Sequence, residues 1–278
     1  MIMNKCLFPV AGYGTRFLPS TKAIPKEMLP ILTKPLIQYG VEEAMSVGIT
    51  NIAMVTSLNK KSIKNYFDLN EEIESIVKGS SKESLLDEIN LICNKCTFSY
   101  VNQSKMLGLG HAIYTGRELI GDEPFAVILP DDLCFNEGPS VLEQMTLLHK
   151  AHPDCCIIAV QEVSDDQVHN YGIIDGDVLN NNENVYRVSK MIEKPNLSDS
   201  PSNLGIVGRY ILTSSIFDTL KNTIPDKNGE IQITDALFSL ARKNKVIAYK
   251  FQGKRYDCGS INGFVEATNF FAKLKGII

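Results

Sequence analysis

The sequence predicts an α/β fold with a mixed, mostly parallel central sheet flanked by helices. Apolar runs typical of buried strands alternate with segments of helical periodicity, beginning with "KCLFPV" at 5–10 and "LIQYGVEEAMSV" at 36–47. Past residue 160 the pattern changes, because "NYGIIDGDVLNNNENVYRVSKMIEKP" has short alternating runs punctuated by Gly and Asn. We therefore expect a small antiparallel subregion beside the main sheet.

Each element is predicted from its own local pattern. Pro35 precedes the helix at 36–47 and Gly48 follows it, which are common signals at the two ends of a helix. The segment 59–94 is rich in polar residues and has apolar residues at helical spacing, which indicates helices on the rim. The other expected strands are 51–56, 125–129, 155–160, 205–212 and 246–251, and the other expected helices are 141–150, 214–220, 230–243 and a last one from 261.

Composition limits the class of protein. The chain has 278 residues, 44% of them hydrophobic, and a formal net charge of -4, which argues against a dedicated nucleic-acid binder. No apolar run approaches membrane-spanning length, and seven cysteines, an odd number, favour reduced thiols in a cytoplasmic protein. We interpret His149 and His152 as surface residues. Without a linker or repeat, 1–278 is predicted to form a single domain with two parts, about 1–160 and about 161–278.

The stretch "FPVAGYGTRFLPSTKAIPKEMLP" follows the first predicted strand and suits phosphate binding. It is not a dinucleotide-binding fingerprint, because Phe17 stands where a third glycine would be, and a P-loop's Gly-Lys-Ser/Thr is also missing. A nicotinamide-dependent oxidoreductase is therefore disfavoured. Prolines stiffen the segment that carries Arg16, Lys22 and Lys26, which predicts a preorganised cation cluster.

Acidic residues follow another predicted strand. In "VILPDDL", Asp131 and Asp132 come after an apolar run whose carboxyl end would open on the same sheet edge as the glycine loop. Mg²⁺ takes one or two carboxylates together with phosphate oxygens, so these residues suggest a magnesium site. The alternative is a turn with an Asp cap. Asp257 in "KRYDCGS" could complete the metal site.

Two further stretches suit a nucleotide-sugar site. Gln103, an amide able to read a base edge, precedes the glycines of "LGLGHA" at 107–112. Glu193 and Lys194 are adjacent before Pro195, so they would point to opposite faces of a straight strand. Only a bend would let both reach one ligand, and the proline favours such a bend.

The motifs together resemble a known family. "AGYGTRFLPSTKAIPKEMLP", "QSKMLGLGHA", "LPDD", "NYGII", "EKP", "GRY", "GEIQITDA" and "KRYDCGS" are similar to the bacterial UTP-glucose-1-phosphate uridylyltransferases, within the sugar nucleotidyltransferases. The resemblance runs nearly end to end. It implies a Rossmann-like, GT-A-type nucleotidyltransferase fold, with a nucleotide-binding part at about 1–160 and a sugar-binding and C-terminal part at about 161–278. Related thymidylyl enzymes typically have Gln where this chain has Glu27.

The resemblance also implies roles for individual residues. Arg16 and Lys26 would hold the triphosphate, and Asp131 would bind Mg²⁺, an ion that Asp257 could share. Gly172 and Glu193 would meet sugar hydroxyls, and Lys194 would meet the sugar phosphate; catalysis would rest on Arg16, Lys26, Asp131 and Lys194. The residues expected to bind nucleotide are Ala11, Gly12, Gly14, Thr15, Glu27, Gln103 and Gly108.

These roles predict transfer of a uridylyl group from UTP to glucose 1-phosphate by Mg²⁺-assisted in-line attack, without a general base. The expected partners are the two small-molecule substrates, with no nucleic acid and no membrane, and the family's habit implies a homodimer or homotetramer. Two alternatives stay open. One is a related enzyme that uses dTTP or another sugar phosphate, and the other is a non-catalytic protein that binds nucleotide sugars.

Overall fold

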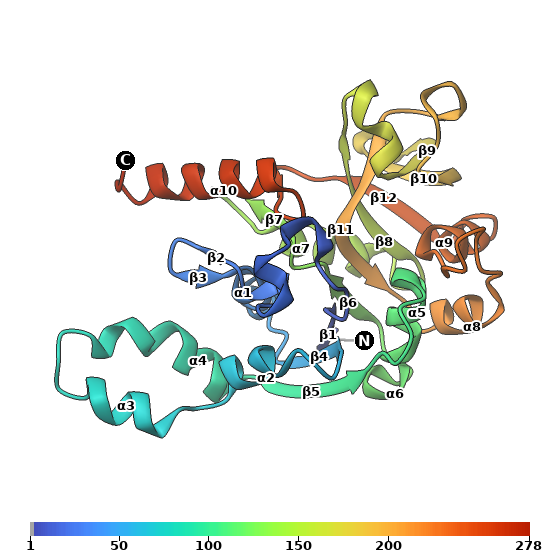
Figure 1. Cartoon of the computed structure of the whole chain (residues 1–278). Helices are drawn as coiled ribbons and strands as arrows, with labels where there is room; N and C mark the ends of the chain where they lie inside the picture. Colours follow the sequence, from blue (N-terminus) through green and yellow to red (C-terminus); the bar gives the residue numbers. More distant parts are fainter. Residues whose placement is uncertain (1–2) are drawn as a thin grey trace.

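A computed structural model describes residues 3–278, whose centre is a nine-stranded sheet (Figure 1). The strand order is β5-β4-β1-β6-β11-β8-β12-β10-β9, and β2-β3 and β13-β7 form two separate ribbons. The strands are β1 (Lys5–Pro9), β2 (Pro30–Ile31), β3 (Lys34–Pro35), β4 (Asn51–Thr56), β5 (Thr97–Asn102), β6 (Phe125–Ile128), β7 (Asp132–Phe135), β8 (Cys156–Glu162), β9 (Gly172–Leu179), β10 (Asn182–Glu193), β11 (Leu204–Leu212), β12 (Val246–Lys250) and β13 (Lys254–Asp257).

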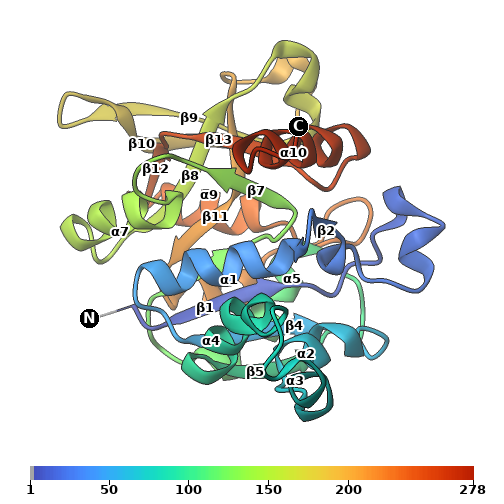
Figure 2. The same ribbon diagram turned by 90° about the vertical axis from the view of Figure 1, so that its left-hand side faces the viewer.

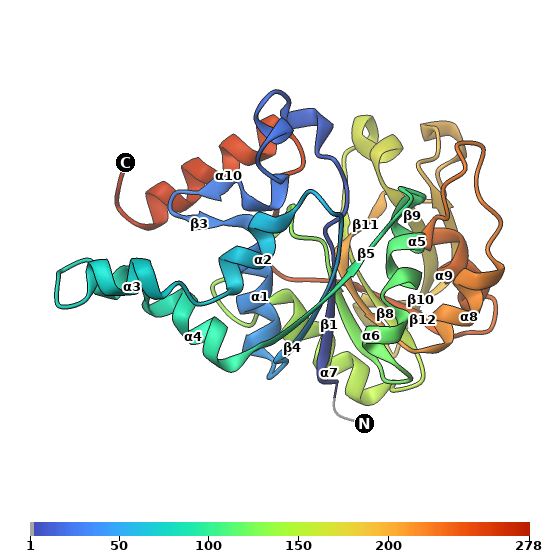
Figure 3. The same cartoon turned by 60° about the horizontal axis from the view of Figure 1, so that its bottom comes forward.

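Helices cover both faces of the sheet, as Figure 3 shows. One face packs on α5, α6, α8 and α9, and the other on α1, α2, α4 and α7. Side chains of β1 alternate between these layers, since Leu7 joins the first and Cys6 and Phe8 the second. The helices are α1 (Leu36–Ser46), α2 (Lys61–Phe67), α3 (Glu71–Val77), α4 (Asp87–Lys95), α5 (Gly108–Thr115), α6 (Arg117–Ile120), α7 (Val141–Ala151), α8 (Ser215–Asn222), α9 (Ile233–Ala241) and α10 (Ile261–Leu274).

The sheet is mixed, with one group of parallel strands at one end and a second parallel pair further along. β5, β4, β1 and β6 run parallel to one another, as do β8 and β12. β11 is antiparallel to both β6 and β8, and β10 is antiparallel to both β12 and β9. The predicted α/β class and the antiparallel subregion are confirmed, although the sheet contains more antiparallel pairing than expected because β11 returns between two parallel groups.

Four parallel strands deliver their carboxyl ends to one edge of the sheet. β1 leads into the glycine loop, and the Val10 amide donates to the Val55 carbonyl of β4 at 2.8 Å. The Gln103 amide in turn donates to the Thr56 carbonyl at 2.8 Å, and β6 leads to Asp131. This edge therefore collects residues from three separate motifs of the sequence, as open α/β sheets do at their ligand sites.

The β7–β13 ribbon brings the end of the chain to the same edge. Its register places Asp257 opposite Asp132, and the Cys258 amide donates to the Asp131 carbonyl at 2.7 Å. α10 packs over this ribbon, where Phe271 joins a small third core with Tyr256 and Leu133 (Figure 2). Helix packing thus holds the late acidic motif against the earlier one.

Most element predictions agree with the structure. The strand at 51–56 is found unchanged as β4, and the helices predicted from 36 and 141 begin at those residues as α1 and α7. The interpretation of His149 as a surface residue was wrong, because His149 lies on α7 and its side chain is buried. His152 follows directly after the end of this helix. Between residues 3 and 278, no helix combines the length and apolar character needed to cross a bilayer.

Candidate active site

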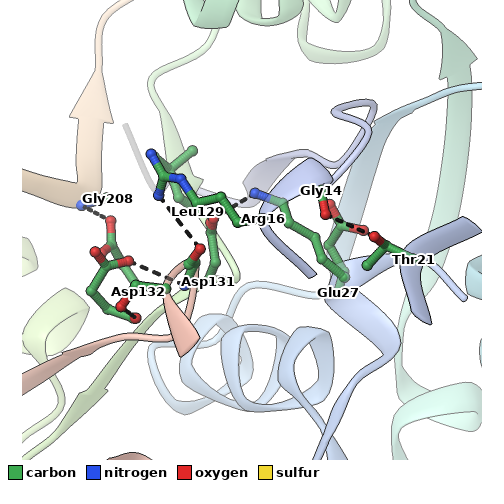
Figure 4. Close-up of polar contacts among 12 residues, drawn as sticks. Gly14, Arg16, Thr21, Glu27, Leu129, Asp131, Asp132 and Gly208 are labelled. Carbon is green, nitrogen blue, oxygen red and sulfur yellow. Dashed lines mark hydrogen bonds and ion pairs between the residues drawn. The ribbon is translucent and has the colours of Figure 1, made fainter. Parts of the chain in front are cut away.

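The glycine loop is irregular, and its turns fix the stem of Lys26. Gly14 has φ 65°, and a methyl group there would lie 3.0 Å from Cβ of Lys26. The Thr21 hydroxyl donates to the Gly14 carbonyl at 2.8 Å, which closes the loop on itself (Figure 4). Three short 3₁₀ turns follow one another, Thr15–Phe17, Ser20–Lys22 and Lys26–Met28. The bare backbone at Gly14 therefore lets Lys26 pack against the loop, since only glycine adopts this conformation without strain.

Lys26 reaches across the sheet edge to Asp131. Its Nζ lies 2.5 Å from Oδ2 of Asp131, and each side chain keeps about a quarter of its surface exposed. Burial alone would lower the pKa of Lys26, but the carboxylates of Asp131 and Glu27 outweigh it and raise that pKa. Burial likewise acts to raise the pKa of Asp131, yet the Lys26 charge holds it below its usual value. Both groups are therefore charged at neutral pH.

Both carboxylate oxygens of Asp132 accept hydrogen bonds from other residues of the protein. Its Oδ1 accepts from Arg255 Nε, and its Oδ2 accepts from the Gly208 amide at 2.9 Å (Figure 4). Arg255 also donates to the Tyr171 hydroxyl at 2.7 Å. Burial raises the pKa of Asp132, an effect that the Arg255 charge opposes. Asp132 thus ties β7 to β11 and β13, whereas Asp131 keeps its carboxylate at the cleft.

Asp257 lies near Asp131 because a glycine leaves room between them. A methyl group built on Gly259 would lie 2.9 Å from Asp131 Oδ2 and 3.1 Å from Asp257 Oδ1. Arg16 Nη1 donates to the Gly259 carbonyl at 3.4 Å, so the predicted phosphate-binding arginine borders the same space. Within residues 3–278 no three His, Cys, Asp or Glu side chains converge as a metal-binding group. Two carboxylates and open space are what this edge offers.

Glu27 is fully paired inside the protein. Its side chain is 1% exposed, and its two oxygens lie 2.7 and 3.0 Å from Nζ of Lys60, which precedes α2. Burial raises the pKa of Glu27 and lowers that of Lys60. The positive charge of Lys60 opposes the rise at Glu27, and the negative charge of Glu27 opposes the fall at Lys60. Sequence reasoning missed Lys60, because only the fold places the residues after β4 beside the 3₁₀ turn at Lys26.

Gln103 and Gly108 occupy the next position along the edge. Gln103 is buried, and its Nε2 lies 2.8 Å from Nδ1 of His111 and 3.4 Å from the Gly108 carbonyl. Gly108 has φ 88°, and a methyl group there would lie 3.1 Å from the Ile231 carbonyl. Ile231 pairs with this segment, donating to the Leu107 carbonyl at 2.8 Å. The conformation and close packing at Gly108 explain the need for a glycine, a role that the sequence alone did not indicate.

The proposed sugar-phosphate residues meet at the end of β10. Glu193 is the last residue of this strand, and Lys194 has φ 44°, so the backbone bends at the position that the sequence predicted. Lys194 Nζ lies 3.6 Å from Glu193 Oε1, and Thr234 donates to Glu193 Oε2 at 2.5 Å. A methyl group on Gly172 would lie 3.1 Å from that same Oε2. Thr234, from the motif "GEIQITDA", is a neighbour that sequence reasoning did not single out.

A cleft of about 850 Å³ contains part of the predicted site. Of the residues predicted from the sequence, its walls include Arg16, Asp131, Gly172, Glu193, Lys194 and Asp257. Its other walls include Tyr171, Thr234 and Arg255, which position the predicted residues. The predicted nucleotide residues Ala11, Gly12, Gly14, Thr15, Glu27, Gln103 and Gly108 are not among its lining residues. Ala11, Gly12, Gly14, Thr15 and Glu27 belong to the glycine-loop segment that also carries Arg16, whereas Gly108 packs against Glu230, which lines the cleft.

Comparisons with known proteins identify the family to which the chain belongs. The nucleotidyl transferase family matches residues 9–273. A UTP–glucose-1-phosphate uridylyltransferase of Pseudomonas aeruginosa is 54% identical over 97% of this chain and 96% of its own. A solved UDP-glucose pyrophosphorylase complexed with UDP-glucose has a TM-score of 0.91 at 56% identity, covering 98% of this chain and 99% of the other. A UTP-bound UGPase from Acinetobacter baumannii has a TM-score of 0.88 at 39% identity, covering 97% and 93%.

Proposed function

Because the chain belongs to the nucleotidyl transferase family, we propose that it transfers the uridylyl group of UTP to α-D-glucose 1-phosphate, giving UDP-glucose and pyrophosphate. The observation that carries this proposal is one cleft that brings cations and carboxylates together. Lys194 and Arg16 supply positive charge, and Asp131 and Asp257 supply carboxylates. Such a cleft suits two phosphorylated substrates that must meet despite their negative charge.

The glycine loop is assigned to UTP. A methyl group on Gly12 would meet no atom of the described chain within 4 Å, so the bare backbone there faces open space that a nucleotide can occupy. Arg16 and Lys26 hold the triphosphate, because both belong to this loop segment and are positioned at the sheet edge, Arg16 by the Gly259 carbonyl and Lys26 by Asp131. The residues assigned to the nucleotide are Ala11, Gly12, Gly14, Thr15, Glu27, Gln103 and Gly108. Glu27 acts from behind the pocket wall, since Lys60 takes both of its oxygens.

Glucose 1-phosphate occupies the other end of the cleft. Gly172 and Glu193 take the sugar hydroxyls, because the missing side chain of Gly172 leaves room beside the Glu193 carboxylate. Lys194 takes the phosphate, and its bent backbone turns its exposed ammonium group into the cleft with Glu193. Thr234 fixes Glu193 by donating to one oxygen, which leaves the carboxylate free to accept from a sugar hydroxyl.

The residues at the sheet edge fit a magnesium ion. The space that Gly259 leaves between Asp131 Oδ2 and Asp257 Oδ1 is where a divalent ion could be held, and Mg²⁺ commonly takes one or two carboxylates plus phosphate oxygens. Asp131 would be the principal ligand and Asp257 the second. When bound, Mg²⁺ would neutralise phosphate charge. The Lys26–Asp131 contact supports this assignment, because it places the Asp131 carboxylate beside the lysine that is assigned to phosphate.

The chemistry requires alignment of two anions and no general base. A phosphate oxygen of glucose 1-phosphate, already ionised, attacks the α-phosphorus of UTP and forms the new P–O bond. The bond from the α-phosphorus to the oxygen that bridges to the β-phosphorus breaks, and pyrophosphate leaves with that electron pair. Lys194 holds the nucleophile in line, while Arg16 and Lys26 stabilise charge on the triphosphate.

Other assignments follow from the same proposal. The part at about 1–160 binds nucleotide, the part at about 161–278 binds sugar and completes the site, and the two act as one domain. The homodimer or homotetramer and the cytoplasmic location stay predictions. A non-catalytic sensor of nucleotide sugars is disfavoured, because every charged residue expected to be catalytic is present.

A matrix of nucleotides and sugars tests the proposal. Purified protein is incubated with Mg²⁺ and with UTP or dTTP, each against glucose 1-phosphate, galactose 1-phosphate and N-acetylglucosamine 1-phosphate, and released pyrophosphate is measured. We expect the highest kcat/KM for UTP with glucose 1-phosphate. A preference for dTTP would assign the chain to the thymidylyl branch, and binding of UDP-glucose without pyrophosphate release in any combination would favour the sensor.

A further inference from the structure

The amide group of Gln103 is held in one orientation by two neighbours. Its Nε2 lies 2.8 Å from Nδ1 of His111, on the first turn of α5, and 3.4 Å from the Gly108 carbonyl oxygen at the start of the same helix. A carbonyl oxygen can only accept a hydrogen bond, so the amide atom that faces Gly108 must be the NH₂ group and not Oε1. The fold thereby fixes which end of the amide points at α5.

This orientation also fixes the tautomer of His111. Because Gln103 Nε2 donates, His111 Nδ1 must accept, and the ring proton must sit on Nε2 of His111. His111 also lines a surface hollow together with Tyr114, Thr115 and Arg117, so its ring has access to water. Burial and the nearby Lys105 lower the pKa of His111, which keeps the ring neutral at physiological pH.

Both protons of the Gln103 amide nitrogen are therefore directed at the protein, and Oε1 is left as the free group. In the described part of the chain no donor bonds this oxygen, and it is not among the fully enclosed polar atoms that lack a partner, so it keeps a small accessible surface although Gln103 is only 5% exposed. Gln103 is anchored at the carboxyl edge of the sheet, where its backbone amide donates to Thr56. The atom of the Gln103 side chain that is left free at this edge is thus a hydrogen-bond acceptor alone.

We propose that His111 is a positioning residue for base selection, which locks the Gln103 amide so that its oxygen accepts from a pyrimidine N3–H. The inference rests on the proposed function, in which Gln103 belongs to the base pocket. Uracil carries a proton on N3 and satisfies this acceptor, whereas N3 of cytosine is itself an acceptor and would leave two acceptors facing each other. If the amide could rotate, its NH₂ group would suit cytosine. His111 therefore acts against CTP without touching the base.

A double-mutant cycle on nucleotide choice tests the proposal. The ratio of kcat/KM for UTP to that for CTP is measured in the wild type, His111→Leu, Gln103→Leu and the double variant, with glucose 1-phosphate saturating. We expect His111→Leu to lower the ratio about tenfold, the scale of one hydrogen bond, with the KM for glucose 1-phosphate unchanged. If His111 acts through Gln103, adding His111→Leu to Gln103→Leu has no further effect on the ratio.

His111→Asn serves as the conservative rescue, because its amide oxygen can replace Nδ1 as an acceptor, and we expect it to keep the wild-type ratio. A purely structural role for His111 would lower both kcat/KM values together and leave the ratio unchanged. An unchanged ratio in folded His111→Leu, or an additive effect in the double variant, would overturn the inference.

A second measurement does not depend on turnover. Nitrogen-15 NMR of the four histidines, with His111 assigned by its loss in His111→Leu, reports which ring nitrogen carries the proton. We expect an unprotonated Nδ1 at pH 7.5, and a protonated Nδ1 would overturn the inference. Wild-type protein that leaves UTP and glucose 1-phosphate unreacted would contradict the proposed function, while the NMR result would still decide the orientation of Gln103.

Discussion

Lys26 and Asp131 form an ion pair in which Nζ and Oδ2 lie 2.5 Å apart, although the two residues come from different motifs. The proposed phosphate-binding cation and the proposed metal-binding carboxylate thus hold each other in place in the protein itself. Binding of substrate and metal must replace this contact with contacts of each group to its own ligand. Variants of Lys26 and Asp131 distinguish the phosphate-binding role from the metal-binding role.

Replacing Lys26 with Ala should lower kcat about 100-fold or more, because it removes a fixed charge from a partly buried phosphate site. Steady-state assays of pyrophosphate release measure the effect. Lys22→Ala is the matched control, since Lys22 lies on the same loop but is exposed, and it should retain nearly full activity. Equal losses in both variants would contradict a specific role for Lys26.

Asp131→Asn and Asp132→Asn should fail in different ways. Asp131→Asn is expected to shift the Mg²⁺ titration of activity to higher concentrations with little change in Tm. Asp132→Asn removes a charge that Arg255 and the Gly208 amide share, so it should lower Tm. Activity titrations and thermal unfolding of both variants test this. A stable Asp131→Asn protein with a wild-type Mg²⁺ curve would remove Asp131 from the metal site.

Gly259→Ala should weaken metal binding, since its methyl group would lie 2.9 and 3.1 Å from the carboxylate oxygens of Asp131 and Asp257. Mn²⁺ binding in the presence of UTP, followed by electron paramagnetic resonance, gives a readout independent of turnover. Gly138→Ala is the control, because its methyl group would make only an ordinary 3.4 Å contact with Asn136. Unaltered Mn²⁺ affinity in Gly259→Ala would argue against an ion between the two carboxylates.

Lys60→Met should destabilise the fold by about 3–5 kcal/mol, because it leaves the Glu27 carboxylate buried without a partner. The double variant Glu27→Gln with Lys60→Met should recover most of that loss, since it removes both buried charges. Urea unfolding of the two variants measures the free energies. A double variant no more stable than Lys60→Met would show that the charge imbalance is not the cause.

Stability should fall as the pH drops below about 6.5, the ordinary histidine value. Burial lowers the pKa of His149, so the folded protein disfavours the charged ring while the unfolded chain takes up a proton. Above the pKa of His149 in the unfolded chain, the free energy of unfolding therefore carries no penalty from this ring. As the pH falls from that value toward the lower pKa of His149 in the folded protein, the free energy of unfolding decreases. Unfolding between pH 5 and 8 should show a shallower dependence in His149→Gln than in the wild type.

The sequence predicted local features well because their signals are local. Apolar runs and end signals located β4, α1 and α7, and Pro195 pointed to the bend at Lys194. Contacts between distant segments were not predictable in the same way. Nothing in the residues near Glu27 indicates that Lys60 will pair with it, and nothing near Gln103 fixes the amide beside His111. Such pairs arise from strand order and helix packing.

Asp131 and Asp132 show the same limit at one position. The sequence offers two adjacent carboxylates, and either could serve as a ligand or as a structural residue. Only the register of β13 against β7 brings Arg255 to Asp132 and leaves Asp131 at the cleft. The preference for Asp131 came from the family resemblance, and the pairing of Asp132 supplies a physical reason for it.

The pairing of β7 with β13 has a consequence for synthesis of the protein. Asp131 leaves the ribosome well before Asp257 and Gly259, because the two segments lie far apart along the chain. Until β13 has paired with β7 and α10 has packed over them, the growing polypeptide contains Asp131 without Asp257 beside it. A chain whose synthesis has not reached this segment therefore lacks the second carboxylate of the proposed metal site, even when its first strands have already paired.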